Sequence, residues 1–205
     1  MKRSERRERE WMEEAEGKEN GAPAAQTSGG PLPVIAIVGR PNVGKSSLFN
    51  SILKRRHAIV HFDSGVTRDR VSAPGVYDGR RFNLIDTGGL GMYSGQKKNL
   101  GFWDQAIEQQ VEAALDDAVT ILFVVDVMDG LTELDKAIAA RLRTCSKKVL
   151  LVANKADNYK GELAADEFHA LGFEKIFPVS SLHRKGINEV LDAALAGVPR
   201  TVREG

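Results

Sequence analysis

One stretch of sequence decides the fold: Val34-Ile35-Ala36-Ile37-Val38-Gly39-Arg40-Pro41-Asn42-Val43-Gly44-Lys45-Ser46. Its first five residues are apolar and mostly β-branched, which is typical of a strand buried on both faces. The remainder matches the pattern G-x-x-x-x-G-K-[ST], and a helical pattern follows over 45–54. A strand, a glycine-rich loop and a helix in this order predict a site for nucleotide phosphates, because the loop N–H groups and the helix N-terminus both favour an anion.

Strand and helix patterns alternate along the rest of the chain. Strands are predicted over 71–77, 81–85, 119–125, 148–153 and 175–179, and helices over 105–116, 134–144, 162–171 and 187–195. This alternation predicts a mostly parallel sheet of six strands with helices on both faces. Asp78-Gly79, between the second and third strands, is a hairpin signal that makes one strand antiparallel. The expected class is therefore α/β, a three-layer sandwich.

Length, composition and charge limit the domain organisation and the partners. The chain has 205 residues, 42% of them hydrophobic, and a net charge of +1. We expect one domain over 31–200, a disordered extension over 1–30 that is first charged and then rich in Gly, Ala and Pro, and a tail or linker over 201–205. The small net charge gives no basis for DNA binding, and no apolar run is long enough to span a membrane. A single cysteine and a charged start without a signal-peptide pattern favour the cytoplasm.

Two further motifs predict how a metal and the terminal phosphate are held. Asp86-Thr87-Gly88-Gly89 follows a predicted strand, so the Asp86 carboxylate can hold Mg²⁺ through a water while the Gly89 N–H bonds the γ-phosphate. Ser46 offers its hydroxyl to the same ion. Thr67, between the first helix and the second strand, can complete the metal shell; the alternative is an ordinary loop threonine.

A third motif predicts the base. Asn154-Lys155-Ala156-Asp157 follows a buried strand, and the Asp157 carboxylate can accept both N–H donors on one edge of guanine. Adenine lacks that donor pair and would leave the carboxylate unpaired. Asn154 either bonds O6 or braces the loop, and Ser180-Ser181-Leu182 offers a backbone N–H to O6 or simply caps a helix. The predicted nucleotide contacts are Gly39, Arg40, Pro41, Asn42, Val43, Gly44, Lys45, Ser46, Ser47, Asp86, Thr87, Gly88, Gly89, Leu90, Asn154, Lys155, Ala156, Asp157, Ser180, Ser181 and Leu182.

Over about 33–196 these motifs resemble the first GTPase domain of the Der (EngA) family of bacterial ribosome-assembly GTPases. The resemblance also rests on Gly65-Val66-Thr67-Arg68-Asp69-Arg70, Phe123-Val124-Val125-Asp126 and Gly130-Leu131-Thr132. It implies a Ras-like P-loop GTPase fold, GTP hydrolysis to GDP and, for a full-length protein, the large ribosomal subunit as partner. Three features depart from the family. Ser64 replaces its usual proline, and the chain carries an unusual N-terminal extension. It also ends at Gly205, where a linker to a second GTPase domain would begin, as expected of a fragment or an isolated domain.

The expected mechanism positions charge rather than forming covalent bonds. Lys45, the loop N–H groups and Mg²⁺ would neutralise the β and γ oxygens. Leu90 stands where many GTPases have a water-orienting glutamine, so we expect Thr67 and Gly89 to hold the water through their backbones and turnover to be slow. The resemblance to K⁺-activated GTPases further implies a K⁺ ion at Asn42; the alternative is that Asn42 merely suits the turn.

Three other readings remain open on the sequence alone. A GTP-dependent scaffold with negligible turnover would share every binding residue. A P-loop ATPase or small-molecule kinase is disfavoured by the motif from Asn154 to Asp157. A GTPase domain of the tRNA-modification type would share Asn42 and the apolar residue after Gly89, whereas the run from Gly65 to Arg70 favours the ribosome-assembly family.

Overall fold

The computed structural model describes residues 31–53, 71–89 and 105–201. Leu32 onward groups into one compact unit. Within the described ranges, no helix is both long and apolar enough to cross a membrane. The proposed boundaries at residues 30 and 200 remain predictions.

Six strands and a set of helices alternate as the sequence predicted. The strands are β1 (Val34–Val38), β2 (Val71–Tyr77), β3 (Arg80–Asp86), β4 (Thr120–Asp126), β5 (Lys148–Asn154) and β6 (Ile176–Pro178). The α-helices are α2 (Lys45–Leu53), α3 (Gln105–Asp117), α4 (Glu133–Arg143), α5 (Tyr159–Ala164) and α6 (Ile187–Ala194), and the 3₁₀ helices are η1 (Thr87–Gly89) and η2 (Ala165–Leu171).

The strands form one sheet in the order β2-β3-β1-β4-β5-β6. All neighbouring pairs are parallel except β2 and β3, which are antiparallel. The predicted α/β class, with six strands and one of them antiparallel, is confirmed. β1 lies between β3 and β4, and every residue of β4 is buried, as expected of a central strand covered on both faces.

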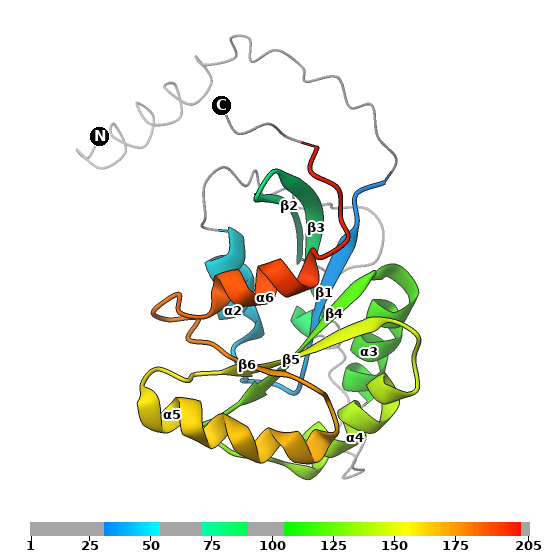
Figure 1. Cartoon of the computed structure of the whole chain (residues 1–205). Coiled ribbons are helices and arrows are strands. Elements are labelled where there is room, and N and C mark those ends of the chain that lie inside the picture. The colour runs from blue at the N-terminus through cyan, green and yellow to red at the C-terminus, as the bar shows by residue number, and fades with distance from the viewer. Residues whose placement is uncertain (1–30, 54–70, 90–104, 202–205) are drawn as a thin grey trace, which may run out of the picture. The chain divides into compact units, whose positions relative to one another are not determined.

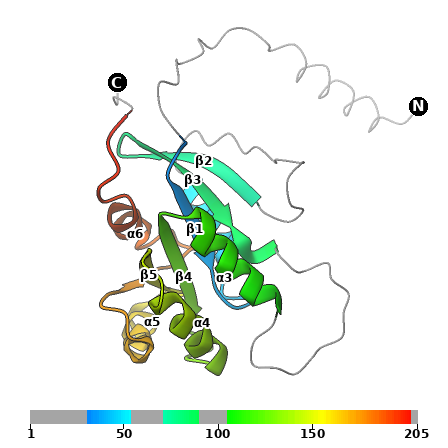
Figure 2. The ribbon, with the colours of Figure 1, turned by 90° about the vertical axis from the view of Figure 1, so that its right-hand side faces the viewer.

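Helices cover both faces of the sheet and create two apolar cores (Figures 1 and 2). On one face, side chains of α2 and α6 such as Leu48 and Val190 pack against Ile35 and Ile37 of β1. On the other face, α3, α4 and η2 pack against the alternate residues of the same strands, with Phe123 and Phe168 among the buried side chains. The alternation of side chains along each strand thus fixes which helix lies on which face.

The hairpin between β2 and β3 is fastened to the last described residues of the chain. Asp78 and Gly79 have φ angles of 48° and 69°, the left-handed pair of a tight hairpin turn. The Thr201 N–H donates to the Gly79 carbonyl at 2.8 Å, and Arg200 Nη2 pairs with Asp78 Oδ2 at 2.6 Å. The Arg200 guanidinium, together with that of Arg80, lowers the pKa of the Asp78 carboxyl although the group is exposed.

One predicted helix differs from the structure. The pattern over 162–171 predicted a single helix, whereas α5 begins earlier, at Tyr159, and the chain continues from Ala165 as η2. The Asn158 side chain accepts from the Gly161 N–H at 3.0 Å and so caps α5. Gly172 ends η2 in the left-handed conformation, with φ of 79°, as predicted for a C-terminal cap.

Candidate functional site

The predicted motifs meet at the edge of the sheet where the parallel strands end. The order of the strands changes direction at β1, which has β3 on one side and β4 on the other. Ile37 of β1 is in register with Asp86 of β3, and Asp126 of β4 is in register with Asn154 of β5. Ligands of open α/β sheets bind at such a reversal, so the topology places the phosphate loop and the base motif around one site.

The phosphate loop has a backbone that its glycines and Asn42 make possible. Asn42 and Gly44 have φ angles of 68° and 94°, in the left-handed region that glycine and asparagine tolerate best. A Cβ on Gly39 would lie 2.5 Å from the Val124 carbonyl oxygen. A Cβ on Gly44 would lie 2.3 Å from Asn154 Nδ2. Both glycines are therefore required by close approach as well as by conformation.

Lys45 folds back over the loop that precedes it. Its ammonium donates to the carbonyls of Gly39 at 2.8 Å and Arg40 at 2.9 Å, and the residue is only 7% exposed. Burial lowers the pKa of the Lys45 ammonium from 10.5 to about 8; the Asp86 carboxylate opposes this lowering and the Arg40 charge adds to it. Within the described residues no carboxylate forms a direct ion pair with this ammonium, so an anion at this position would supply one.

Ser46 and Asp86 supply a pair of oxygen ligands. Ser46 Oγ donates to Asp86 Oδ2 at 2.9 Å, and the Gly88 N–H donates to Asp86 Oδ1 at 2.8 Å. The Thr87 hydroxyl, which is buried, donates to the Ile37 carbonyl at 2.6 Å and fastens the turn to β1. A hydroxyl and a carboxylate are hard oxygen ligands, so this pair fits Mg²⁺, which prefers oxygen and keeps several waters. Within the described ranges no group of three or more His, Cys, Asp or Glu gathers as a metal cluster.

Asn154 connects the base motif to the phosphate loop. Its Nδ2 donates to the Val43 carbonyl at 2.9 Å. Its Oδ1 accepts from the Ser181 backbone N–H at 3.2 Å and from Ser181 Oγ at 2.9 Å. Of the two roles that the sequence left open for Asn154, this geometry favours bracing the loop over contacting O6.

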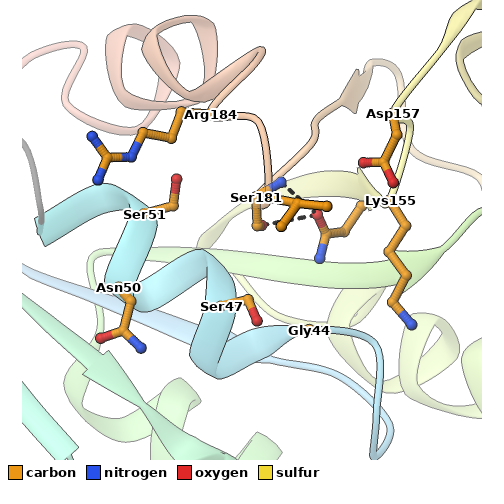
Figure 3. Close-up of a pocket in the computed structure, with 10 residues that line it drawn as sticks. Gly44, Ser47, Asn50, Ser51, Lys155, Asp157, Ser181 and Arg184 are labelled. Atoms are coloured by element: carbon orange, nitrogen blue, oxygen red, sulfur yellow. Dashed lines mark hydrogen bonds between the residues drawn. The ribbon is translucent and has the colours of Figure 1, made fainter.

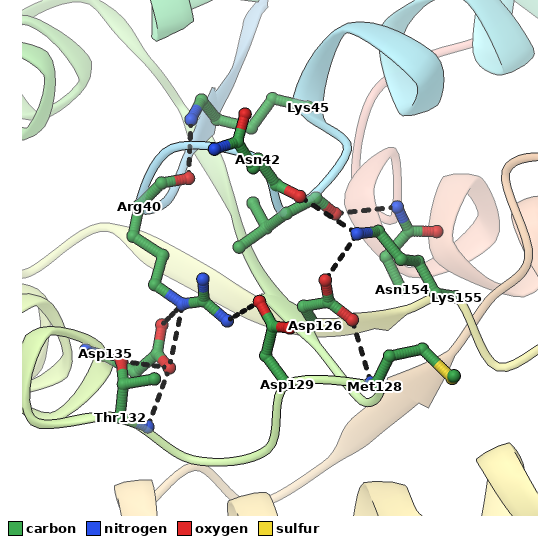
Figure 4. A network of polar contacts seen from close by, with 11 residues as sticks. Arg40, Asn42, Lys45, Asp126, Met128, Asp129, Thr132, Asp135, Asn154 and Lys155 are labelled. Carbon is green, nitrogen blue, oxygen red and sulfur yellow. Dashed lines mark hydrogen bonds and ion pairs between the residues drawn. The ribbon is translucent and has the colours of Figure 1, made fainter.

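Lys155 makes a second connection between the same two regions (Figure 4). Its ammonium donates to the Asn42 carbonyl at 3.0 Å and pairs with the fully buried carboxylate of Asp126 at 2.5 Å. Asp126 also accepts from the Met128 N–H at 2.8 Å. From the sequence, Asp126 was recognised only as part of a family pattern, and its ion pair with Lys155 was not predicted.

Asp157 lies at the other end of a pocket that starts at the phosphate loop (Figure 3). The pocket has a volume of about 490 Å³, and its lining includes Gly44, Ser47, Lys155, Asp157 and Leu182. This size is typical of sites for small ligands. Asp157 is exposed there, and its Oδ1 accepts from the buried Ser180 hydroxyl at 2.5 Å, which orients the carboxylate.

Arg40 departs from its predicted place among the nucleotide contacts. Its side chain turns away from the loop and away from Lys45 toward the connection between β4 and α4 (Figure 4). There Nη2 pairs with Asp129 at 3.1 Å and Nε lies 3.4 Å from Asp135. Only the backbone of Arg40 is left to serve the predicted role.

Of the remaining residues predicted to contact the nucleotide or the metal, some lie within the described ranges and some outside them. Val43 and Ala156 are buried, whereas Pro41 and Ser47 are exposed at the surface. Gly89 ends η1, but Thr67 and Leu90 lie outside the described residues, and their predicted roles remain predictions. Sequence reasoning also missed Asp135; the spacing Thr132-x-x-Asp135 is a capping signal that would have placed it at the start of α4.

Comparisons with known families and sequences agree with this geometry. Residues 34–155 match the model of the family described as 50S ribosome-binding GTPase. The chain is 43% identical over 171 residues to the GTPase Der of Christiangramia forsetii, a match that covers 83% of this chain and 38% of the relative. It is 46% identical over 168 residues to the GTPase Der of Thioalkalivibrio sulfidiphilus, covering 82% and 35% of the two chains. The predicted resemblance is confirmed, and the chain spans little more than a third of these relatives.

Solved structures of other GTPases share the fold. An Era variant from Aquifex aeolicus bound to GDP and AlF₄⁻ is 30% identical with a TM-score of 0.61, and the match covers 84% of this chain and 57% of that one. The G domain of the FeoB iron transporter of T. maritima is 26% identical with a TM-score of 0.58, covering 81% and 98%.

Proposed function

Because the chain belongs to the 50S ribosome-binding GTPase family, we propose that it binds GTP with Mg²⁺ and hydrolyses it slowly to GDP and phosphate. One observation carries the proposal: the phosphate loop and Asp157 face a single pocket, and Asn154 and Lys155 bond the loop directly. The pocket therefore couples a triphosphate grip to a carboxylate that suits guanine.

The phosphates would occupy the space in front of the loop and Lys45. The Lys45 ammonium would exchange part of its contact with the Gly39 and Arg40 carbonyls for the β and γ oxygens. Ser46 and Asp86 would hold Mg²⁺, Asp86 through water as predicted, and the ion would add positive charge where the transition state gains negative charge. The Gly89 N–H and Thr67, predicted from the sequence, would orient the attacking water.

Exchanging the base specificity tests the proposal. Asp157→Asn places an amide where guanine presents two N–H donors, so GTP affinity should fall roughly 100-fold. Xanthine has a carbonyl in place of the exocyclic amine, so XTP affinity should rise in the same variant. Titration calorimetry with Mg·GTP, Mg·XTP and Mg·ATP measures all three. Unchanged GTP affinity in the variant, or ATP bound as tightly as GTP by the wild type, would refute the guanine assignment.

Phosphate release decides between an enzyme and a GTP-dependent scaffold. We expect slow single-turnover release from Mg·GTP that is faster in KCl than in NaCl. Asn42, whose left-handed backbone is held by Lys155 through its carbonyl, is the proposed K⁺ ligand, so Asn42→Ala should equalise the two salts. GTP binding without measurable release in either salt favours the scaffold, and equal wild-type rates in both salts reject the K⁺ site.

A role in assembly of the large ribosomal subunit, in the cytoplasm, is the broader part of the proposal. The family description and the Der relatives support this role. Because the chain covers 38% and 35% of two of these relatives, the proposal concerns a protein of their full length. The same relatives favour this family over the tRNA-modification GTPases. Co-sedimentation of a full-length protein with 50S subunits in the presence of a non-hydrolysable GTP analogue, compared with GDP, would test it.

A further inference from the structure

We propose that Arg40 is a positioning residue for the reaction, because its side chain tethers the phosphate loop to the N-terminus of α4. The proposal rests on the GTPase function proposed above. It assigns no contact with substrate to the guanidinium. It states that the ion pairs of Arg40 with Asp129 and Asp135, here called the loop tether, set the position of the loop backbone on which Lys45 rests.

The loop tether is buried at its centre. The Arg40 side chain is 11% exposed and the Asp135 side chain is 0% exposed, whereas Asp129 is 56% exposed. A buried carboxylate is stable only when it is paired and hydrogen-bonded. In the described part of the chain, every ion pair of Asp135 comes from Arg40. The Asp135–Arg40 pair is therefore the mutually dependent part of the tether, and Asp129 is a solvent-exposed second arm.

Asp135 is itself held rigidly by the helix that carries it. Its Oδ2 accepts from the Thr132 N–H at 3.1 Å and from Thr132 Oγ1 at 2.7 Å, and its own N–H donates to Thr132 Oγ1 at 3.2 Å. These bonds form a reciprocal cap at the start of α4, whose Ile138 and Leu142 are buried in the core. The tether thus fastens the loop to a fixed element rather than to a mobile surface group.

The loop is held on its other side by different bonds. The Asn42 and Val43 carbonyls accept from Lys155 and Asn154, at 3.0 and 2.9 Å. Among the side chains of the described residues, only the Lys45 ammonium donates to the Gly39 and Arg40 carbonyls. At residue 40, the side chain is what ties the backbone to the rest of the fold.

This arrangement makes the placement of Lys45 depend on Arg40. The Arg40 carbonyl accepts from the Lys45 ammonium at 2.9 Å, so movement of residue 40 moves the group that would neutralise the transferred phosphate. Charge stabilisation of a transition state is sensitive to displacement, and a shift of about 1 Å costs on the order of 100-fold in rate. Loss of the tether should therefore lower the rate at saturating GTP more than it weakens GDP binding.

Five variants test this dependence: Arg40→Ala, Arg40→Lys, Asp135→Asn, the double variant Arg40→Ala/Asp135→Asn and, as a matched control, Arg141→Ala. Arg141 also lies on α4 and pairs through Nε and Nη2 with Glu112 at 2.8 and 2.9 Å, but it has no bond to the loop. The measurements are the single-turnover rate at saturating Mg·GTP in KCl, the GDP dissociation constant, and thermal unfolding of each nucleotide-free protein.

Arg40→Ala should lower the rate roughly 10- to 100-fold and raise the GDP dissociation constant less than about fivefold. Arg40→Lys should lie between it and the wild type, because one ammonium cannot bridge two carboxylates as a planar guanidinium does. Asp135→Asn should also slow the rate, and the double variant Arg40→Ala/Asp135→Asn should be no slower than Arg40→Ala, since the two residues act as one unit.

Arg141→Ala should keep its rate within about twofold of the wild type. A wild-type rate in Arg40→Ala, or an equal loss in Arg141→Ala, overturns the inference, because the effect would then be absent or merely one of stability. If Arg40→Ala does not fold, Arg40→Lys and Asp135→Asn decide, and normal rates in both overturn it. Absence of GTP binding and release in the wild type would instead defeat the proposed function.

Discussion

Replacing Lys45 with methionine should stabilise the nucleotide-free protein while destroying its hold on phosphate. Burial lowers the pKa of this ammonium from 10.5 to about 8, which corresponds to a cost of about 3 kcal/mol for keeping it charged in the folded state. Methionine has a similar shape and no charge. It would forfeit the bonds to the Gly39 and Arg40 carbonyls, worth about 1 kcal/mol each. The expected net gain near pH 7 is about 1 kcal/mol.

The stability difference between Lys45→Met and the wild type should depend on pH. Between pH 8 and 10.5 the folded protein has released the Lys45 proton that the unfolded chain still holds, so wild-type stability rises with pH over that window. Lys45→Met lacks this rise. Urea unfolding of both proteins without nucleotide, at half-unit intervals from pH 7 to 10, should therefore show the advantage of the variant shrinking and then reversing. Other titrating groups are common to both proteins and cancel in the difference.

The control is Lys136→Met, which removes a half-exposed ammonium paired with Glu133 on the surface of α4. Its stability should differ from the wild type by a few tenths of a kcal/mol, about equally at all these pH values. A Lys45→Met protein that is less stable at pH 7, or whose difference from the wild type does not change with pH, would refute the view that Lys45 is stored in the folded protein as an unfavourable charge.

Two further predictions follow from the glycines and from the hairpin. Gly44→Ala should abolish GDP binding measurable by calorimetry, because the added Cβ would lie 2.3 Å from Asn154 Nδ2. The control is Gly197→Ala, at a similar φ of 90° but with nothing within 4 Å of the added Cβ. This control should lose only about 1 kcal/mol of stability and bind GDP normally. Equal binding by both variants would contradict the steric argument. Arg200 lowers the pKa of the Asp78 carboxyl in the folded protein below its ordinary value of 3.8. The ionised carboxylate therefore stabilises the fold above pH 3.8, and this stabilisation is lost as the pH falls through the lowered pKa. The free energy of unfolding of Asp78→Asn should consequently depend less steeply on pH in this range than that of the wild type. Identical acid profiles for the two proteins would show that the Asp78–Arg200 pair does not contribute to stability.

The sequence predicted the sheet well because its strands have distinctive patterns. Val34–Val38 and 121–125 are continuous apolar runs, which are typical of a central strand, and Asp78-Gly79 between two strand patterns is typical of a tight hairpin. The predicted start of the helix at residue 162 was wrong, because α5 begins at Tyr159 and includes Gly161. Gly161 packs so closely against Ala156 that a Cβ on the glycine would lie 3.0 Å from the Ala156 Cα. Close packing of that kind has no signature in local sequence.

For the site, the motifs located the strand ends but not the directions of long side chains. Gly39, Asp86 and Asn154 each follow or end a predicted strand, which sufficed to place them at one edge of the sheet, since parallel strands end at one edge. Arg40 reaches Asp135 across 95 positions of sequence, and no pattern around either residue links them. Its assignment to the nucleotide was a reasonable extension of the loop motif, and only the tertiary structure reveals where the guanidinium lies.

The double attachment of the base motif to the phosphate loop constrains how such a domain can evolve. Asn154 and Lys155 hold the Val43 and Asn42 carbonyls, so a substitution at either one would disturb triphosphate binding before any new base preference could be selected. Asp157 is the exception, because it is exposed and accepts from the Ser180 hydroxyl, which lies outside the loop. A laboratory selection for a different purine should therefore recover changes at 157 and its surroundings, and leave 154 and 155 untouched.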